Sequence, residues 1–303
     1  MNQKKHILLT GGTGLIGRHL TEALLQKGYT VSQLSRSTGK DARVKTYLWD
    51  VNKGEIDELC IDGVDTVLHL AGAGIAEKRW TDGRKKEIIE SRTKSIGLIY
   101  GLIKNKPNQV KNIISASATG YYSDRGDELM TEESPPADDF LGTCCVKWEK
   151  AVDEGAVLGL QVLKLRTGVV LTKDGGALAK MAIPVKLYFG SPLGDGRQWI
   201  PWIHWKDVVA LYLYGIENEN LTGVYNMVAP NPVTNQQLTQ AIAKQLHKPL
   251  WAPNVPAFAL KLMLGEMATI VLGSTKASAQ KIEDSGFKFQ YPDIFSALKE
   301  IYG

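Results

Sequence analysis

A glycine-rich turn near the start of the chain limits the fold more than any other feature. Residues 10–17 read Thr-Gly-Gly-Thr-Gly-Leu-Ile-Gly and directly follow a short apolar run. Gly11 allows a tight turn, Gly14 lets the backbone approach a pyrophosphate, and Gly17 lets a helix lie close to a sheet. Residues 19–25 then show apolar side chains at helical spacing. Strand, turn and helix in this order predict a dinucleotide-binding unit, because the helix N-terminus offers N–H groups to phosphate. The alternative is a tight β–α turn without a ligand.

Strand-like and helix-like segments alternate through the first half of the chain. A helical pattern covers residues 83–104, and similar patterns lie between most of the strand-like runs. Repeated β-α-β order with right-handed crossovers gives a parallel sheet with helices on both faces. We therefore expect an α/β protein with a Rossmann-type, doubly wound parallel sheet. The expected strands are residues 6–10, 30–35, 45–49, 66–70, 112–117 and 161–166.

The character of the sequence changes after residue ~168, which suggests a second domain. Loops rich in glycine and proline appear, as at residues 190–196, and the tail is mostly helical. A helix at 206–217 and a strand at 223–227 interrupt this part and continue the pattern of the first half. The predicted dinucleotide-binding domain is residues 1–168, to which residues 203–228 return. The predicted substrate-side C-terminal domain, smaller and mostly helical, is residues 169–202 and 229–303.

Charge and apolar segments argue against two classes of partner. The formal net charge is +4 over 303 residues, and no basic stripe is visible, so we expect no nucleic acid partner. The most apolar late segment, residues 255–273, contains Lys261 and Glu266 and therefore predicts packed helices and no membrane span. We expect a small-molecule substrate and a chain that acts as a monomer or homodimer.

Cysteine usage favours a reducing compartment. The three cysteines, Cys60, Cys144 and Cys145, show no metal-ligand spacing, and adjacent cysteines rarely pair. His204 and Asp207 have no third ligand at a suitable spacing, so we predict no metal site. The first strand begins near residue 6, which leaves no room for a signal peptide. A cytoplasmic location is the expectation.

The end of the second strand indicates which dinucleotide is bound. NAD-binding turns are typically followed, ~20 residues on, by an acid that binds the adenosine ribose. Here Ser35 and Arg36 occupy this place, and the first acid is Asp41. A guanidinium pairs with a 2′-phosphate that a carboxylate would repel, so we predict NADP, bound by Arg36 with Ser35 as its companion. A solvated loop cation is the alternative for Arg36. Asp50 either accepts a hydrogen bond from adenine or begins a turn. The other predicted cofactor contacts are Gly11, Thr13, Gly14, Leu15, Ile16, Gly17, Leu70, Ala71 and Gly72.

Three segments, residues 10–17, 69–73 and 115–122, together resemble the extended short-chain dehydrogenases/reductases, which share the fold of nucleotide-sugar epimerases and dehydratases. Further motifs make the chain similar to an epimerase-like subfamily that has its own C-terminal domain of unknown function. The resemblance implies an NADP(H)-binding oxidoreductase or epimerase of sugar-like substrates, with the late domain lining the substrate cleft. The further motifs are residues 78–81, 120–126, 145–149, 166–171, 193–198, 201–204, 225–226 and 265–268.

The resemblance also implies a proton relay, but one member of it is missing. The wider family uses a serine or threonine at the end of the fifth strand and Tyr-x-x-x-Lys on the next helix. Ser117 occupies the serine place, and we assign Lys147 to the lysine place, where it would hold the nicotinamide ribose. Thr143 then stands four residues earlier, where the tyrosine is expected. Its aliphatic hydroxyl is a much weaker acid than a phenol and cannot replace it unaided.

Three substitutes for the missing acid remain open. Tyr121 or Tyr122 follows Ser117 at the carboxyl end of a strand, where active sites of open sheets gather. Cys145 could donate a proton if Lys147 lowers the pKa of its thiol. The third possibility is that no acid exists. Packing under a loop is the alternative role for the tyrosines, and a small buried apolar side chain is the alternative for Cys145.

Four further residues are candidates for substrate contacts. Arg79 and Trp80 follow a glycine-containing loop and could clamp an anionic, ring-bearing substrate, although Trp80 would equally serve as core packing. Gln198 and Trp202 stand behind the glycine turn at 194–196, which is suited to a substrate wall. The leading prediction is an NADP(H)-dependent oxidoreductase or epimerase acting on a hydroxyl or keto group of a small polar, nucleotide-sugar-like molecule. The alternative is a non-catalytic NADP(H)-binding sensor or regulatory protein on the same fold.

Overall fold

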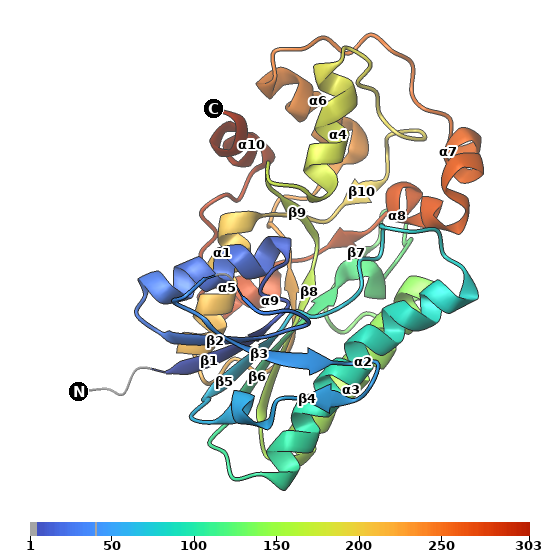
Figure 1. The fold of residues 1–303 in the computed structure, drawn as a ribbon. Coiled ribbons are helices and arrows are strands. Elements are labelled where there is room, and N and C mark those ends of the chain that lie inside the picture. The colour runs from blue at the N-terminus through green and yellow to red at the C-terminus, as the bar shows by residue number, and fades with distance from the viewer. Residues whose placement is uncertain (1–4, 40) are drawn as a thin grey trace.

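The structure, a computed structural model, describes residues 5–39 and 41–303. Figure 1 shows a central sheet flanked by helices and a smaller, mostly helical lobe above it. The expectation about a signal peptide falls on the first residues, of which 1–4 lie outside the described part of the chain. Within that part, none of the helices is long and apolar enough to cross a membrane.

The described residues form an eight-stranded central sheet. Its strands are β1 (His6–Thr10), β2 (Thr30–Ser35), β3 (Lys45–Asp50), β4 (Glu55–Ile56), β5 (Thr66–His69), β6 (Asn112–Ala118), β8 (Gln161–Thr167) and β12 (Gly223–Met227). Their order is β12-β8-β6-β5-β1-β2-β3-β4, and every pair is parallel except β3 with β4. The chain moves outward in opposite directions from β1, toward β2 and toward β5. This switch point opens a crevice at the carboxyl ends of the strands.

Helices cover both faces of the sheet, which confirms the predicted doubly wound α/β fold. On one face, α1 (Leu15–Gln26) packs beside α5 (Trp205–Glu217), and on the other α2 (Asp82–Asn105) packs beside α3 (Phe140–Val157). Side chains alternate along a strand, so Ile7 and Leu9 join the core under α1 and α5. Leu8 points the other way and joins the core under α2 and α3.

The helix after β6 is α3, which spans Phe140–Val157. It begins at Phe140, because the side chain of Asp139 accepts a hydrogen bond from the backbone N–H of Gly142 at 2.9 Å and caps the first turn. The expected return strand is β12, and it pairs in parallel with β8 at the edge of the sheet.

The C-terminal lobe has its own core and several short strands. Its helices are α4 (Gly176–Lys186), α6 (Asn235–Gln245), α7 (Ala257–Leu264), α8 (Thr269–Leu272) and α10 (Ile294–Tyr302), whereas α9 (Gln280–Asp284) packs against β12 of the central sheet. The short strands outside the central sheet are β7 (Leu129–Met130), β9 (Val169–Leu171), β10 (Trp199–Ile200), β11 (Trp202–His204), β13 (Val233–Thr234) and β14 (Lys276–Ala277). The 3₁₀ turns of the described residues are η1 (Glu58–Ile61) and η2 (Thr119–Tyr121), both beside the central sheet, and η3 (Gly265–Ala268) in the lobe. The part of the chain that follows β8 therefore extends over the carboxyl ends of the sheet strands, where the crevice lies (Figure 1).

Candidate functional site

The glycine turn between β1 and α1 is shaped by close backbone contacts. Gly11 has a positive φ of 70°, and an added Cβ would lie 3.0 Å from the carbonyl group of Leu70. At Gly17 an added Cβ would overlap the carbonyl oxygen of Gly11. Gly14, the N-cap of α1, has only that same oxygen nearby, at 3.2 Å, and no side chain caps the helix. The turn therefore leaves open space and free backbone N–H groups at the N-terminus of α1.

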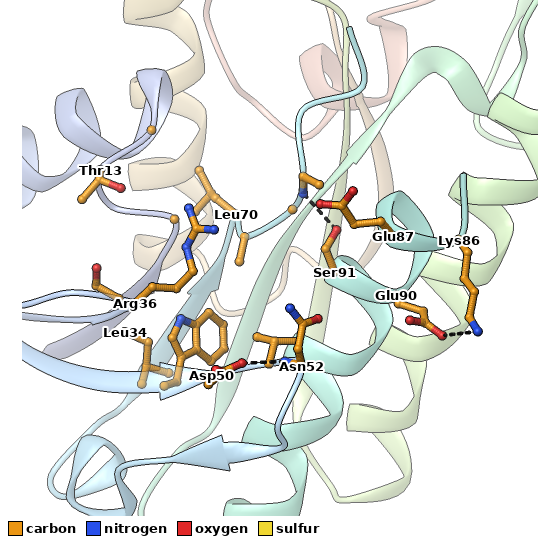
Figure 2. Close-up of a pocket in the computed structure, with 18 of the residues that line it drawn as sticks. Thr13, Leu34, Arg36, Asp50, Asn52, Leu70, Lys86, Glu87, Glu90 and Ser91 are labelled. Carbon is orange, nitrogen blue, oxygen red and sulfur yellow. Dashed lines mark hydrogen bonds and ion pairs between the residues drawn. The ribbon is translucent and has the colours of Figure 1, made fainter. Parts of the chain in front are cut away.

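A cavity of about 510 Å³ lies beside this turn, at the switch point of the sheet. Figure 2 shows Arg36 on one side of it and the α2 residues Glu87 and Ser91 on the other, with Leu70 between. Predicted cofactor residues that line it are Gly11, Thr13, Gly14, Ser35, Arg36, Asp50, Leu70, Ala71 and Gly72. Leu15, Ile16 and Gly17 form the first turn of α1 behind it.

At the end of the cavity away from the glycine turn lie the cation Arg36 and the turn that follows Asp50. Arg36 makes no ion pair with any described residue, and its side chain extends into the cavity. The carboxylate of Asp50 accepts hydrogen bonds from the backbone N–H groups of Asn52 at 3.0 Å and Lys53 at 3.2 Å. Asp50 therefore begins a turn, as one of its two predicted roles requires, and it also lines the cavity. A second cavity of about 420 Å³, sharing Arg36 and Trp49, adjoins this end.

Ser117 belongs to a buried polar network at the carboxyl ends of β6 and β8. Its hydroxyl donates a hydrogen bond to Glu149 on α3 at 2.6 Å. Arg166 on β8 donates to both oxygens of Glu149, at 2.8 and 2.9 Å. Arg166 also donates to the hydroxyl of Tyr122 at 2.9 Å, and Tyr122 donates to Asn226 at 2.7 Å. These hydrogen bonds satisfy the polar atoms of a region where an unpaired group would be costly.

The two candidate tyrosines differ sharply in their surroundings. Tyr122 is fully buried, and burial raises the pKa of its hydroxyl to about 12. Its hydroxyl already serves Arg166 and Asn226, so a role for Tyr122 as the proton donor is not supported. Tyr121 is half-buried, its ring centroid lies 3.4 Å from the Arg166 guanidinium carbon, and its hydroxyl has no hydrogen bond to a described residue. Of the two, Tyr121 is the one whose hydroxyl remains available.

The register of α3 corrects the assignment of Lys147. Thr143 and Lys147 are both exposed, on the side of the helix opposite the buried Cys145 and Glu149. An added Cβ on Gly120, in the loop after β6, would lie 3.5 Å from Leu141 and 3.9 Å from the Cys145 sulfur. Leu141 and Cys145 are four residues apart and face the site, so they occupy the places expected for tyrosine and lysine.

The structure does not support Cys145 as an acid or Lys147 as its activating cation. The Cys145 thiol is buried and lies 3.7 Å from the carbonyl oxygen of Ala118. Burial raises its pKa, and the exposed Lys147 points away from it. A buried, apolar setting is the environment of an inert thiol.

Two of the predicted substrate contacts, Arg79 and Trp80, lie near the C-terminal lobe. Arg79 is exposed and donates hydrogen bonds to the carbonyl oxygens of Leu262 and Met263 at the end of α7, at 3.4 and 3.3 Å. Trp80 packs edge-on against Phe140, with ring centroids 4.7 Å apart. Both residues lie in the loop before α2 that reaches the C-terminal lobe. Their contact with a substrate stays a prediction.

Gln198 and Trp202 lie inside the C-terminal lobe. Trp202 has no exposed surface, and its indole N–H donates to the carbonyl oxygen of Asn231, which does not support the predicted substrate contact for Trp202. Its ring fills the core of the lobe. Gln198 is buried, and its amide nitrogen donates to the carbonyl oxygens of Leu193 and Val271, which assigns it to holding the loop together.

Several residues of the site escaped the sequence analysis. Cavity residues from β3, the turn after it and α2 include Trp49, Asn52, Glu87, Glu90 and Ser91. The sequence pattern predicts only a helix for the α2 residues, because nothing in their spacing marks a ligand. Glu149 and Arg166 had a signal, since both end or begin motifs that carry the family resemblance.

Comparisons with known proteins agree with this architecture. The family described as NAD dependent epimerase/dehydratase matches residues 7–140, and a domain of unknown function, DUF1731, matches residues 255–301. Epimerase family protein YfhF of Bacillus subtilis is 36% identical over 298 residues, which cover 98% of this chain and 97% of that protein.

Two solved structures are similar over almost the whole chain. Human epimerase family protein SDR39U1, crystallised with NADPH, has a TM-score of 0.87 and 30% identity, and the match covers 98% of this chain and 99% of that one. A nucleoside-diphosphate sugar epimerase from Corynebacterium glutamicum has a TM-score of 0.81 and 32% identity, covering 99% of this chain and 59% of that one.

Proposed function

The chain belongs to the NAD dependent epimerase/dehydratase family, and on that premise we propose that it is an NADP(H)-dependent oxidoreductase or epimerase. Its substrate would be a small polar molecule with a hydroxyl or keto group, of the nucleotide-sugar kind. The human relative crystallised with NADPH and the nucleoside-diphosphate sugar epimerase support the cofactor and the substrate class respectively.

The cavity beside the glycine turn is the observation that carries this proposal. It joins the open N-terminus of α1, suited to a pyrophosphate, to the unpaired Arg36, suited to a 2′-phosphate. Gly11 and Gly17 bring backbone segments so close together that the space above Gly14 stays free of side chains. The residues present thus fit NADP(H). Arg36 and Ser35 would hold its adenosine end, and the Leu70–Gly72 backbone would line its middle.

The chemistry proposed for the chain's own residues centres on one phenol. When bound, NADP(H) supplies hydride transfer at a carbon that bears oxygen. Tyr121 would hold or move the proton at its own hydroxyl, because that oxygen makes no hydrogen bond to any residue that the structure describes. Ser117, whose hydroxyl is held by Glu149, would lie beneath the reacting oxygen and help to position it.

A second function, a non-catalytic NADP(H) sensor, is favoured by one specific observation. Leu141 and Cys145 stand where the family's acid and its cation are expected, and neither side chain can act as either at neutral pH. In that case the cofactor would be bound without turnover, and its presence would be signalled through the C-terminal lobe.

The domain boundaries and the surroundings of the protein also remain proposals. We propose residues 1–168 with 203–228 as the dinucleotide-binding domain, and the remainder as the substrate-side domain. We further propose a cytoplasmic location, because the three cysteines are all unpaired and buried, and a monomer or homodimer as the assembly.

Calorimetry with NADPH and NADH tests the proposal first. Purified protein should bind NADPH more tightly, because the 2′-phosphate can pair with Arg36, which makes no ion pair with a described residue. A panel of nucleotide sugars, aldehydes and ketones, followed by the near-ultraviolet absorbance of NADPH, then tests turnover. Tight binding together with turnover of a panel member supports the enzyme, whereas tight binding without any turnover favours the sensor. Equal or absent binding of both nucleotides overturns the cofactor assignment.

A further inference from the structure

The place of the family's lysine leaves the nicotinamide half of the site without its usual cation. In open α/β sheets a dinucleotide crosses the switch point, so Arg36 and Asp50 mark the adenosine half. We therefore expect the other half over β5 and its neighbour β6, on the side of Gly72, which lines the cavity, and of Ser117 at the end of β6. On α3 the residue that faces this region is Cys145, which carries no positive charge.

A cation from another helix lies against this half of the site. The guanidinium of Arg92 on α2 donates hydrogen bonds through Nη1 to the carbonyl oxygens of Ala73 at 3.1 Å and Ile88 at 2.8 Å. An added Cβ on Gly72 would lie 3.0 Å from its central carbon. Because Gly72 and Ala73 line the cofactor cavity, the Arg92 guanidinium packs directly behind the cavity wall.

The charge of Arg92 has no counter-charge in the described part of the chain. Its neighbour on the same helix, Arg84, is paired with Glu77 and Glu87, and Arg166 is paired with Glu149. Arg92 is half-buried over the ring of Trp148, at 4.9 Å from the ring centroid. Burial lowers its pKa, and burial also raises the pKa of the two thiols on α3, Cys144 and Cys145, so neither thiol supplies a negative charge to it.

Partly burying a cation without a carboxylate partner costs free energy, unless a ligand supplies the missing hydrogen-bond acceptors. Nε and Nη2 of Arg92 make no hydrogen bond to a described residue. Neither atom is fully enclosed by protein, so a ligand can reach them. They therefore keep donors available on the side of the guanidinium that Ala73 and Ile88 do not use. The same region is where ribose hydroxyls and phosphate oxygens would supply acceptors.

We propose that Arg92 is the cation of the nicotinamide half of the cofactor site, in place of the family's lysine. Arg92 binds the ribose–phosphate oxygens of that half and fixes the Gly72–Ala73 backbone against them. This inference rests on the proposed function, because it takes NADP(H) to be the ligand of the cavity. It differs from the family arrangement in that the charge comes from α2 instead of α3.

The experiment compares NADPH with adenosine 2′,5′-bisphosphate, which has the adenosine half and lacks the nicotinamide half. Calorimetry on Arg92→Met should show NADPH affinity reduced about tenfold to a hundredfold, the loss typical of a charge-assisted hydrogen bond. Affinity for adenosine 2′,5′-bisphosphate should change less than about twofold, since that ligand stays near Arg36. Lys104→Met, an exposed substitution on the same helix that lies outside the cavity lining, is the matched control and should change neither.

Two further variants separate charge from loop structure. Arg92→Lys keeps the charge but not the planar guanidinium, so it should bind NADPH more tightly than Arg92→Met and less tightly than the wild type. Arg92→Gln keeps a donor for Ala73 without the charge and should bind no better than Arg92→Met. The proposal is overturned if Arg92→Gln binds NADPH like the wild type, or if Arg92→Met loses both ligands equally. A wild-type protein that binds neither ligand would instead overturn the proposed function itself.

Discussion

The carboxylate of Glu149 accepts two hydrogen bonds from the guanidinium of Arg166, and both side chains are buried. The pair ties α3 to β8 at the edge of the sheet where the candidate site lies. Glu149 also accepts a hydrogen bond from Ser117, so this serine is held from the α3 side. The face of the same guanidinium supports the Tyr121 ring. One ion pair therefore fixes the positions of both residues that we assign to the reaction.

Glu149→Gln should lower the free energy of unfolding by about 3–5 kcal/mol, because it leaves Arg166 as a buried cation without a counter-charge. Urea unfolding of the variant and the wild type measures this. Glu58→Gln removes the exposed pair with Lys106 and serves as the control, with an expected loss below about 1 kcal/mol. Equal losses in the two variants would show that the Glu149–Arg166 pair adds nothing beyond a surface pair.

Arg36→Glu should reverse the order of affinity for NADPH and NADH. The substitution replaces a charge-assisted hydrogen bond with repulsion of the 2′-phosphate, and a carboxylate at this place suits the free ribose hydroxyl of NADH. A loss of about tenfold or more for NADPH is expected from the magnitude of such bonds. Calorimetry with both nucleotides measures it, and Arg197→Glu, an exposed change outside the cavity, is the control. Unchanged affinities in Arg36→Glu would remove Arg36 from the site.

Gly14→Val and Gly17→Ala should fail in different ways. Valine at Gly14 projects into the open space at the N-terminus of α1, so NADPH binding should be lost while the melting temperature stays near that of the wild type. Alanine at Gly17 would overlap the carbonyl oxygen of Gly11, so the melting temperature itself should fall. Thermal unfolding with and without NADPH distinguishes the two. If Gly14→Val still binds NADPH normally, the dinucleotide does not lie at this turn.

The sheet was predictable because its signals are local and agree with one another. β1 and α1 follow from an apolar run, a turn that needs glycine, and helical spacing, and each supports the same interpretation. The start of α3 also has a local signal, since Asp139 is a good N-cap three residues before Gly142. The face that α3 turns toward the site has no such signal, so the assignment of Lys147 to the lysine place rested on the family resemblance alone.

The site itself depends on contacts that no local pattern contains. Ser117, Glu149, Arg166 and Asn226 come from four different elements, and only the fold brings them together. Burial of a large aromatic residue is equally non-local. Trp202 stands in a glycine- and proline-rich region typical of a rim, yet it fills the core of the C-terminal lobe. Arg92 has no sequence signal, because its proposed role follows from the lack of a carboxylate partner among the described residues, which only the fold reveals.

His69 should make the protein less stable as the pH falls below neutrality. Burial, followed by the charge of Arg92, lowers its pKa in the folded protein from 6.5 to about 3. The unfolded chain therefore binds the proton first, so the stabilisation is complete above about pH 6.5 and declines as the pH falls toward 3. Between pH 7 and pH 5 this residue should remove about 2 kcal/mol from the free energy of unfolding.

Urea unfolding of His69→Gln at these two pH values checks this contribution. Glutamine can still reach the hydroxyls of Ser95 and Ser115, which lie 2.8 and 3.0 Å from the His69 ring nitrogens, but it does not titrate. The difference between pH 7 and pH 5 should shrink by about 2 kcal/mol in this variant. It does not vanish, since burial also lowers the pKa of His204, to about 4. The exposed His247→Gln should leave the difference unchanged, and an identical change in both variants would contradict the assignment.

Tyr121→Phe should reduce turnover by about 10²–10⁴-fold if the chain is an enzyme, the range typical for loss of a general acid. Tyr122→Phe should leave turnover within a few-fold and instead lower stability, because Arg166 and Asn226 lose a buried partner worth about 1–3 kcal/mol. Cys145→Ala should affect neither by more than a few-fold. Turnover is measured with a substrate from the NADPH oxidation panel. A Tyr121→Phe variant that remains fully active would show that the proton comes from another group or from water. The contact between Arg166 and the Tyr121 ring would then contribute to stability alone.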